Sequence, residues 1–263
     1  MPVDMAALAA DLAAESAVTR ALVAGLDEAG WHTPTPAAGW DIADQISHLA
    51  YFDDVAVKSA VRPDEFRADL AATPDSVNAD TIAARYRDRT GAELLAWFDT
   101  ARAELLDTFA TIDPHQRLPW FGPAMSAASS LTARLMETWA HTQDIADALG
   151  VTREPTGRLR HVAHIGVGAR AFSYAARGQA MPDVPVRVEL TAPDGAVWTW
   201  GPADVADQVA GDALDFCLLV TQRRHRDDLA LTIEGETAQQ WMAFAQAFAG
   251  PPGPGREPTR KAP

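Results

Sequence analysis

The feature that most constrains the fold is a helical spacing of apolar side chains that recurs through the first 150 residues. Apolar residues stand three or four positions apart, the period of one helix face, over 3–29, 41–62, 80–112 and 126–149. Residues that start or stop helices bound these segments, among them Asp41 ahead of the second and Gly150 behind the fourth. Amphipathic helices of this kind bury their apolar faces against one another. We therefore predict a four-helix bundle over residues 1–150.

Two connectors in this half are rich in residues that disfavour regular structure. Residues 64–78 abound in Asp, Pro and Ala, which predicts a long loop or a short irregular helix. The stretch LPWFGPAMS at 118–126 holds two prolines and a glycine, which predicts a loop. Within it, Trp120, Phe121 and Met125 either line the mouth of a pocket or anchor the loop.

After Gly150 the pattern changes from helices alone to helices and strands. VPVRVEL and AVWTWG alternate around a Pro-Asp-Gly turn, which predicts a β-hairpin, and LALTIEG predicts a third strand. Helices are predicted over 157–177, 211–220 and 237–249. We therefore predict a small α+β domain over 151–250, and a disordered tail over the Pro/Gly-rich residues 251–263. The fold class is a two-domain α+β protein.

The composition excludes several classes of function. The 263-residue chain has a formal net charge of -14, which repels nucleic-acid phosphates and anionic lipid. No apolar run is long enough to span a membrane, and the N-terminus lacks the basic start of a signal peptide. The single cysteine, Cys217, stands among apolar residues and is expected to be a buried, inert thiol. We expect a cytoplasmic protein that binds neither nucleic acid nor a membrane.

Groups that can do chemistry gather on the fourth predicted helix, where Glu137, His141 and Asp144 follow at positions i, i+4 and i+7. Residues four apart lie within about 40° of each other around a helix, so these side chains share one stripe. A carboxylate and an imidazole one turn apart can bind the same divalent cation. The alternative is an ordinary Glu–His pair on a solvated face, although the neighbours at 135, 136, 139 and 140 are apolar.

His48 supplies a third donor from the second predicted helix. It stands among Ile46, Leu49 and Phe52, where a histidine is otherwise a hydrogen-bonded core residue. Two imidazoles and one carboxylate leave coordination positions open, as in catalytic zinc sites. Our hypothesis is one divalent-metal site made of His48, Glu137 and His141.

Three segments carry a resemblance to a known family: GWDIADQISHLAYFDD, METWAHTQDIADALG and the α+β half that follows. They resemble the mycothiol-dependent maleylpyruvate isomerase family of DinB-like metal-binding proteins, over nearly the whole chain. The most specific part is Trp40 followed eight positions later by His48-Leu49, together with the late Glu-x-x-x-His-x-x-Asp. RLRHVAHIGVGARAFSYAARG, ELTAPDGAVWTWGP and LDFCLLVTQRRH are similar to an actinobacterial branch known as metal-binding.

The resemblance implies that His48, Glu137 and His141 bind a divalent metal, usually zinc, while Asp144 orients a ligand. It also implies mycothiol as a low-molecular-weight thiol cosubstrate and a small-molecule electrophile as its target. The expected activity is that of an isomerase or thiol S-transferase in which a metal-bound thiolate attacks the electrophile. Two alternatives stay open: a hydrolase whose metal activates water, and a non-catalytic metal- or ligand-binding module.

Three further residues are candidates for binding the thiol cosubstrate. Trp120 lies in the loop before the metal-binding helix, whereas His164 and Arg170 lie on the first helix of the second domain. An arginine can pair with a carboxylate, so an active site between the two domains would use Arg170. The alternative for His164 and Arg170 is a solvated helix face.

Overall fold

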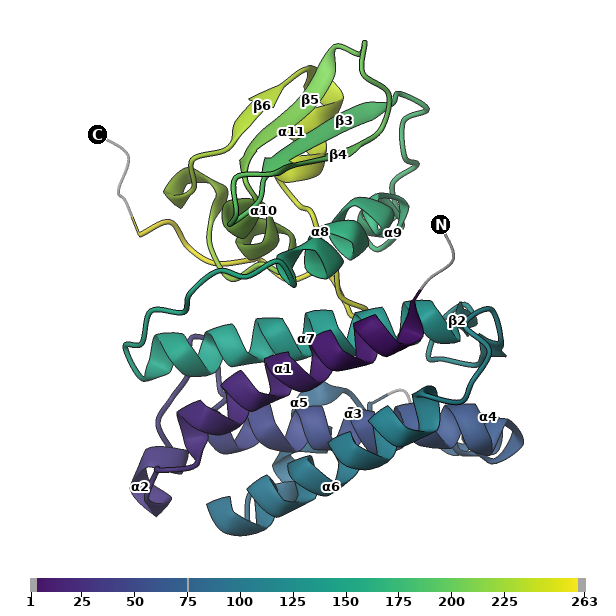
Figure 1. Cartoon of the computed structure of the whole chain (residues 1–263), viewed down its shortest axis with the longest axis vertical. Coiled ribbons are helices and arrows are strands. Elements are labelled where there is room, and N and C mark those ends of the chain that lie inside the picture. The colour runs from purple at the N-terminus through teal and green to yellow at the C-terminus, as the bar shows by residue number, and fades with distance from the viewer. Residues whose placement is uncertain (1–3, 75, 260–263) are drawn as a thin grey trace. The chain divides into compact units, whose positions relative to one another are not determined.

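The computed structural model describes residues 4–74 and 76–259, and the chain divides into two compact units, Met1–Arg153 and Glu154–Pro263 (Figure 1). Unit 1 is helical, and unit 2 combines helices with a four-stranded sheet. The predicted α+β fold class, a helical bundle followed by an α+β part, is confirmed. The division between the units falls just after Gly150.

Four long helices make up most of unit 1: α1 (Met5–Val23), α3 (Ile42–Val61), α6 (Gly91–Phe109) and α7 (Ala127–Ala148). Helix α3 packs against α6 and α7, and α1 closes the bundle against α7 and α6. The interior between them is filled by fully buried apolar side chains, including Leu12, Ile46, Leu49, Leu105 and Leu131. This is the bundle that the spacing of apolar residues predicted.

Local sequence signals fix where the two helices with the candidate ligands begin. Asp41 accepts a hydrogen bond from the backbone of Asp44 at 2.9 Å, and the Asp44 carboxylate accepts one from the backbone of Asp41 at 3.3 Å. This reciprocal cap opens α3 as predicted. Ser126 caps α7 by accepting from the backbone of Ser129 at 3.1 Å, and Gly150 follows its end with φ 67°.

Two predicted helices of unit 1 are divided in the structure. The segment 3–29 forms α1 and then the short α2 (Glu28–Trp31), which Asp27 caps. The segment 80–112 forms α5 (Ala79–Ala83), the 3-10 turn η1 (Ala84–Tyr86) and α6. Thr90 and Glu93 cap each other at the start of α6, so a new helix begins there instead of the old one continuing.

Two connectors are more regular than predicted. Residues 63–72 form a true helix, α4 (Pro63–Ala72), because a proline in the first turn has no N–H to lose there. In the loop before α7, β1 (Arg117–Leu118) and β2 (Met125–Ser126) form a two-residue antiparallel ladder around the prolines. The ladder holds both ends of this loop together.

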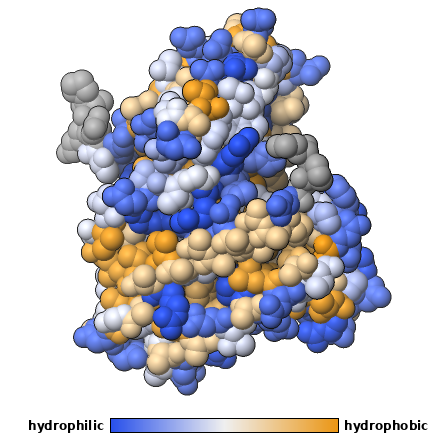
Figure 2. Space-filling model, in the orientation of Figure 1, coloured by the Kyte–Doolittle hydropathy of each residue, from blue (hydrophilic) through white to orange (hydrophobic). Residues whose placement is uncertain are grey.

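Helix α1 turns an alanine-rich face outward. Figure 2 shows hydrophobic residues in a pale orange band that follows this helix across unit 1. The exposed positions of the helix include seven alanines: Ala6, Ala7, Ala10, Ala13, Ala14, Ala17 and Ala21. Alanine has the highest helix propensity, so this face strengthens the helix locally without adding polar groups.

Unit 2 is built on a mixed sheet in the order β4-β3-β5-β6. Its strands are β3 (Val186–Thr191), β4 (Val197–Trp200), β5 (Asp207–Asp212) and β6 (Thr232–Glu234). The predicted β3–β4 hairpin is confirmed, with Leu190 opposite Trp198. Strand β5 was not predicted, because DQVAGD is short and polar, yet it pairs parallel with β3 in the middle of the sheet.

The helices of unit 2 are α8 (Leu159–Gly168), α9 (Arg170–Ala175), α10 (Ala213–Val220) and α11 (Glu236–Met242), with a 3-10 turn η2 (Arg226–Asp228). The single helix predicted over 157–177 is thus divided at Ala169, and the one predicted over 237–249 ends early. Residues 251–259 form no helix or strand, and the backbone N–H of Thr259 donates to Asp228; residues 260–263 lie outside the described part. None of the described helices is both long and apolar enough to cross a membrane.

Candidate metal centre

Three side chains from two helices converge in unit 1, His48 from α3 and Glu137 and His141 from α7. The Oε2 atom of Glu137 lies 3.2 Å from Nε2 of His141 and 3.7 Å from Nε2 of His48. One potential donor atom from each residue lies within 4.8 Å of the other two. The structure therefore brings together all three residues that the sequence predicted as ligands.

The spacing fits a single small cation. In a tetrahedral zinc site, ligand bonds of about 2.0–2.2 Å place neighbouring donor atoms roughly 3.3–3.5 Å apart. The measured separations of 3.2 and 3.7 Å bracket that value. Two imidazoles and one carboxylate are also a usual donor set for Zn²⁺ and for other divalent transition metals. The residues thus fit a divalent metal, with coordination positions left for a ligand from solution.

Burial and charge set the protonation of the cluster. Burial, followed by the charge of His141, lowers the pKa of His48 to about 4 in spite of the nearby Glu137. Burial alone would raise the pKa of Glu137, but hydrogen bonds and charges from His141 and His48 outweigh it and hold that pKa well below its usual range. At neutral pH Glu137 is therefore a carboxylate and His48 a neutral imidazole, the forms that bind a cation.

A chain of hydrogen bonds fixes the ring of His141. Thr35 donates its hydroxyl hydrogen to the carbonyl of Trp40 at 2.9 Å, so its oxygen accepts from the Gln45 amide nitrogen at 2.9 Å. The other end of that amide, Oε1, must then face Nδ1 of His141 and accept its hydrogen. With Nδ1 protonated, the Nε2 atom of His141 carries the lone pair of the ring. This atom faces Glu137 and can coordinate a metal.

Asp144 is the residue that we expected to orient a metal ligand. It is fully buried on α7, but the partner of Nδ1 of His141 is Gln45, and Nδ1 of His48 has no hydrogen-bond partner in the described residues. The ring-orienting contact that we expected of Asp144 is thus made to His141 by Gln45. A catalytic role of Asp144 stays a prediction.

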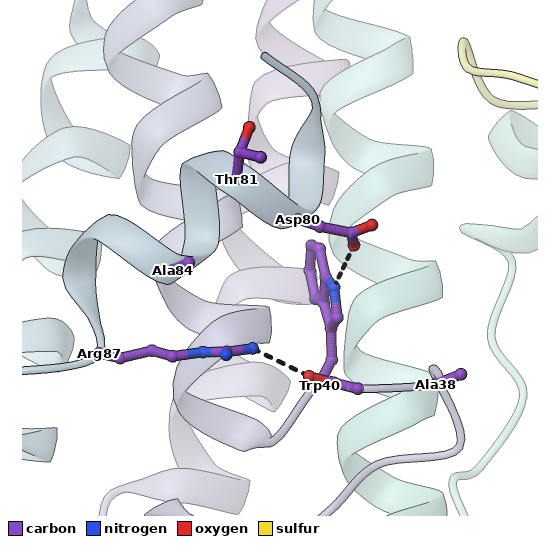
Figure 3. Close-up of a pocket in the computed structure, with 7 residues that line it drawn as sticks. Ala38, Trp40, Asp80, Thr81, Ala84 and Arg87 are labelled. Carbon is purple, nitrogen blue, oxygen red and sulfur yellow. Dashed lines mark hydrogen bonds between the residues drawn. The ribbon is translucent and has the colours of Figure 1, made fainter. Parts of the chain in front are cut away.

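Trp40 packs against both ligand rings. Its ring lies 5.9 Å from that of His141, nearly parallel, and 5.3 Å from that of His48. Figure 3 shows the indole pointing to α5, where its N–H donates to Asp80 at 2.7 Å. Trp40 and Asp80, together with Arg87, line a cavity of about 360 Å³. Trp40 is therefore a wall shared by the ligand cluster and this cavity.

An aromatic cluster covers His48 from the other direction. The ring of Phe52 lies 4.7 Å from His48 and 6.4 Å from Trp120, and Trp120 stacks on Phe66 at 6.1 Å. Trp120 is thus linked to His48 through Phe52. Phe121 packs at the edge of the cluster and is 45% exposed. The loop before α7 is anchored by its aromatic residues, and the role of Trp120 in binding a cosubstrate stays a prediction.

The other two residues predicted to bind the cosubstrate lie in unit 2. His164 is exposed on α8, and its Nδ1 accepts a hydrogen bond from Trp200 at 3.4 Å. Arg170 begins α9 and donates from Nη1 to the carbonyl of Val184 at 2.9 Å. Their assignment to the cosubstrate stays a prediction.

One buried carboxylate joins the two helices that carry the candidate ligands. Asp53 of α3 accepts from Arg102 of α6 at 2.6 Å and from Arg134 of α7 at 2.8 Å. Arg102 also donates to Ser16 of α1 and, at 2.9 Å, to Thr138 of α7. This Asp53 network, as we call it, ties all four long helices together and fixes how α3 and α7 are aligned.

Sequence reasoning missed Gln45 and the Asp53 network. Gln45 lies three residues before His48, so its place on the same helix face was a usable signal. Asp53, Arg102 and Arg134 interrupt apolar stripes, which indicates buried charges but does not say how they pair. Only the packing of the helices reveals these partners.

Comparisons with known proteins find matches to both units of the chain. A family model described as the mycothiol maleylpyruvate isomerase N-terminal domain matches residues 12–146, which include all three candidate ligands. A second model, described as wyosine base formation, matches residues 182–233, most of the sheet of unit 2. The first match spans half of the chain; the second is confined to part of unit 2.

Relatives and solved structures extend the likeness along the chain. Two proteins from Mycobacterium tuberculosis, strains CDC 1551 / Oshkosh and ATCC 25618 / H37Rv, are each 48% identical to it over 94% of this chain and 97% of theirs, and both are described as uncharacterized. The crystal structure of the mycothiol-dependent maleylpyruvate isomerase matches with a TM-score of 0.59 and 15% identity, over 88% of this chain and 93% of that one. A mutant of the same enzyme, with one histidine changed to alanine, gives a TM-score of 0.60 at 16% identity and the same coverage. At such identities the structures show a shared fold.

Proposed function

Because the chain belongs to the family defined by the mycothiol maleylpyruvate isomerase N-terminal domain, we propose that it is a metal-dependent enzyme that uses the thiol of mycothiol on a small electrophile. The observation that carries the proposal is the convergence of His48, Glu137 and His141 on one point, with donor separations suited to one cation. The proposed activity is isomerisation or thiol S-transfer.

His48, Glu137 and His141 would hold the metal, which we propose is zinc. When bound, such a cation supplies a Lewis acid that favours a coordinated thiol in its thiolate form at neutral pH. The protein itself prepares the donors. Gln45 keeps Nε2 of His141 free, burial keeps His48 neutral, and the two histidines keep Glu137 ionised.

The chain's own thiol is unsuited to the reaction, which favours a thiol from solution. Cys217, the single cysteine, is fully buried on α10 in unit 2. Burial raises its pKa far above the ordinary thiol value, so it stays protonated and unreactive. Trp40 and Phe52, packed on the ligand histidines, would shield an incoming thiol from water.

The two forms of the proposed activity differ in the fate of the thiol. In an isomerase, the sulfur adds to a conjugated carbon–carbon double bond, the resulting single bond rotates, and the sulfur leaves again as the double bond re-forms. The thiol is then recovered unchanged. In an S-transferase the new carbon–sulfur bond remains, and one thiol is consumed for each product formed.

Removing a ligand should remove the metal. We expect the purified chain to bind one equivalent of Zn²⁺, and His48→Ala or His141→Ala to weaken binding by about 100-fold or more, beyond the 10–100-fold effect typical of outer partners. Elemental analysis and competition with a chelator measure this. His115→Ala is the matched control, because His115 is exposed in a loop away from the cluster. Full metal content in both ligand variants would refute the site.

Adding the thiol tests the reaction. Zinc-loaded protein should convert conjugated keto acids or other small electrophiles only when mycothiol is present, with thiol recovered for isomerisation and consumed for transfer. Glu137→Gln should abolish this turnover. Turnover at an undiminished rate without any thiol would instead indicate a hydrolase in which the same site activates water.

A further inference from the structure

Unit 2 contains a second pocket, and all the residues that line it belong to that unit. A cavity of about 270 Å³ is lined by residues of α8, α9, β3 and α11 and by Met181 and Gly201. Its walls are apolar, with Val167, Ala171 and Val186 among them. Arg170 is the single charged side chain among the described residues that line it.

Two of the residues that line this pocket carry buried N–H groups without acceptors. Arg170 donates to Val184 through Nη1 alone, while its Nε and Nη2 are buried and have no partner in the parts of the chain that are described. The indole N–H of Trp241, a residue only 1% exposed, likewise has no partner there. Buried donors without acceptors are costly, and in native proteins they call for an explanation.

The identity of the unpaired atoms indicates the ligand. Nε and Nη2 form the side edge of the guanidinium, where two parallel N–H bonds match the two oxygens of a carboxylate. Trp241 packs 5.8 Å from the Arg170 guanidinium, so its ring helps to hold that edge in place. The apolar walls suit a hydrocarbon body attached to the carboxylate.

We propose that unit 2 binds a small monocarboxylate with an apolar body, its carboxylate paired with Nε and Nη2 of Arg170 and its body against Val167, Ala171 and Met181. The site needs no metal, and this proposal gives Arg170 a role different from the cosubstrate binding predicted from the sequence. A carboxylate without an apolar body would pair with Arg170 but leave the apolar walls uncovered. An apolar molecule without a charge would cover the walls but leave the Arg170 N–H groups unpaired.

Calorimetric titration of the full-length protein tests the proposal with sodium hexanoate, 1-hexanol and inorganic phosphate as probes. Hexanoate should bind at least about 10-fold more tightly than either of the other two, because a charge-assisted hydrogen bond contributes roughly that factor or more. Equal binding of hexanol, equal binding of phosphate, or no binding of hexanoate at millimolar concentration would each overturn the proposal.

Variants locate the binding in the pocket. Arg170→Gln should weaken hexanoate binding about 10- to 100-fold. Arg170→Lys should restore it only in part, because lysine keeps the positive charge but lacks the two parallel N–H groups of the guanidinium. Arg187→Gln is the matched control, since Arg187 lies on β3 and already pairs with Glu189. Binding unchanged in Arg170→Gln would place the ligand elsewhere and refute the site. His141→Ala should bind hexanoate normally, which separates this proposal from the metal site.

Discussion

At the scale of single residues, Gln45 decides which nitrogen of His141 is offered to a ligand. Its amide is oriented by Thr35, whose hydroxyl is in turn committed to the carbonyl of Trp40. A partner that holds the far side of a metal-binding histidine both fixes the ring and sets its tautomer. Gln45 therefore fixes the ring of His141 without offering an atom to the proposed metal.

Changing Gln45 should weaken metal binding without preventing it. Gln45→Leu removes the acceptor for Nδ1 of His141, and we expect Zn²⁺ affinity to fall by about 10- to 100-fold. Competition with a chromophoric chelator measures the loss. Gln143→Leu, a glutamine of α7 bonded to Asp147, serves as the control. An unaltered affinity in Gln45→Leu would show that the hydrogen bond does not orient the ring.

Cys217 gives a second prediction at this scale, on pH dependence. Because burial raises its pKa, the folded state keeps the thiol proton while the unfolded chain loses it above about pH 9. The free energy of unfolding should therefore fall as pH rises past that value, by up to roughly 1.4 kcal/mol per pH unit from this group. Below pH 8 the same group should have no effect.

The comparison of wild type with Cys217→Ala isolates this effect. Both proteins share every other titrating group, so the difference between their urea denaturation midpoints should change with pH only in the alkaline range. Thiol reagents should label the wild type only after unfolding. Rapid labelling of the native protein would show that Cys217 is accessible, contrary to its burial.

At the scale of elements, the helices are positioned by their ends. Helix α6 begins at Gly91, where a side chain would meet the buried ring of Trp31: an added Cβ would lie 2.2 Å from its Nε1. The Thr90–Glu93 cap fixes the backbone at the start of α6. Glycine is therefore needed at position 91 to make room for the Trp31 ring of α2, and not for its backbone freedom. This contact closes one end of the bundle.

Gly91→Ala should destabilise unit 1 by about 1–3 kcal/mol, the usual cost of forcing an extra methyl group into a packed core. Gly25→Ala is the matched control, because an added Cβ there meets nothing within 4 Å. That substitution should leave stability unchanged or raise it slightly. Chemical denaturation followed by tryptophan fluorescence compares the two, and equal midpoints would contradict the packing described for Trp31.

At the scale of the whole bundle, we expect the Asp53 network to couple stability to the proposed metal site. Asp53 is fully buried and holds two buried arginines, each from a different helix. Removing one partner of such a cluster leaves charges buried without compensation. Since Asp53 lies five residues after His48, and Arg134 three before Glu137, the network also sets the distance between the ligands.

Asp53→Ala should therefore destabilise the protein by about 3–5 kcal/mol and also weaken Zn²⁺ binding, although Asp53 contacts no ligand. Asp99→Asn provides the control, because the Asp99–Arg20 pair is exposed and worth no more than about 1 kcal/mol. Urea denaturation and chelator competition measure the two effects. Normal metal affinity in a folded Asp53→Ala protein would show that the network does not align the helices.

Local patterns in the sequence were enough to predict most of the elements and the residue types of the candidate metal ligands. Apolar spacing and caps are local, so the bundle, the start of α3 at Asp41 and the hairpin of unit 2 could be predicted from neighbouring residues. The predicted helix boundaries were wrong where a cap interrupts a continuous apolar pattern, as at Thr90. The polar strand β5 could not be predicted because its place in the sheet depends on partners distant in sequence.

Which side chains meet depends on tertiary packing. His48 and Glu137 are separated by 89 residues, and nothing local to either one fixes the 3.7 Å between them. That distance follows from the packing of α3 on α7, the Asp53 network and the cap at each helix start. The unpaired Nε and Nη2 of Arg170 could not be predicted from the sequence either, because the surrounding fold decides whether these atoms have a partner.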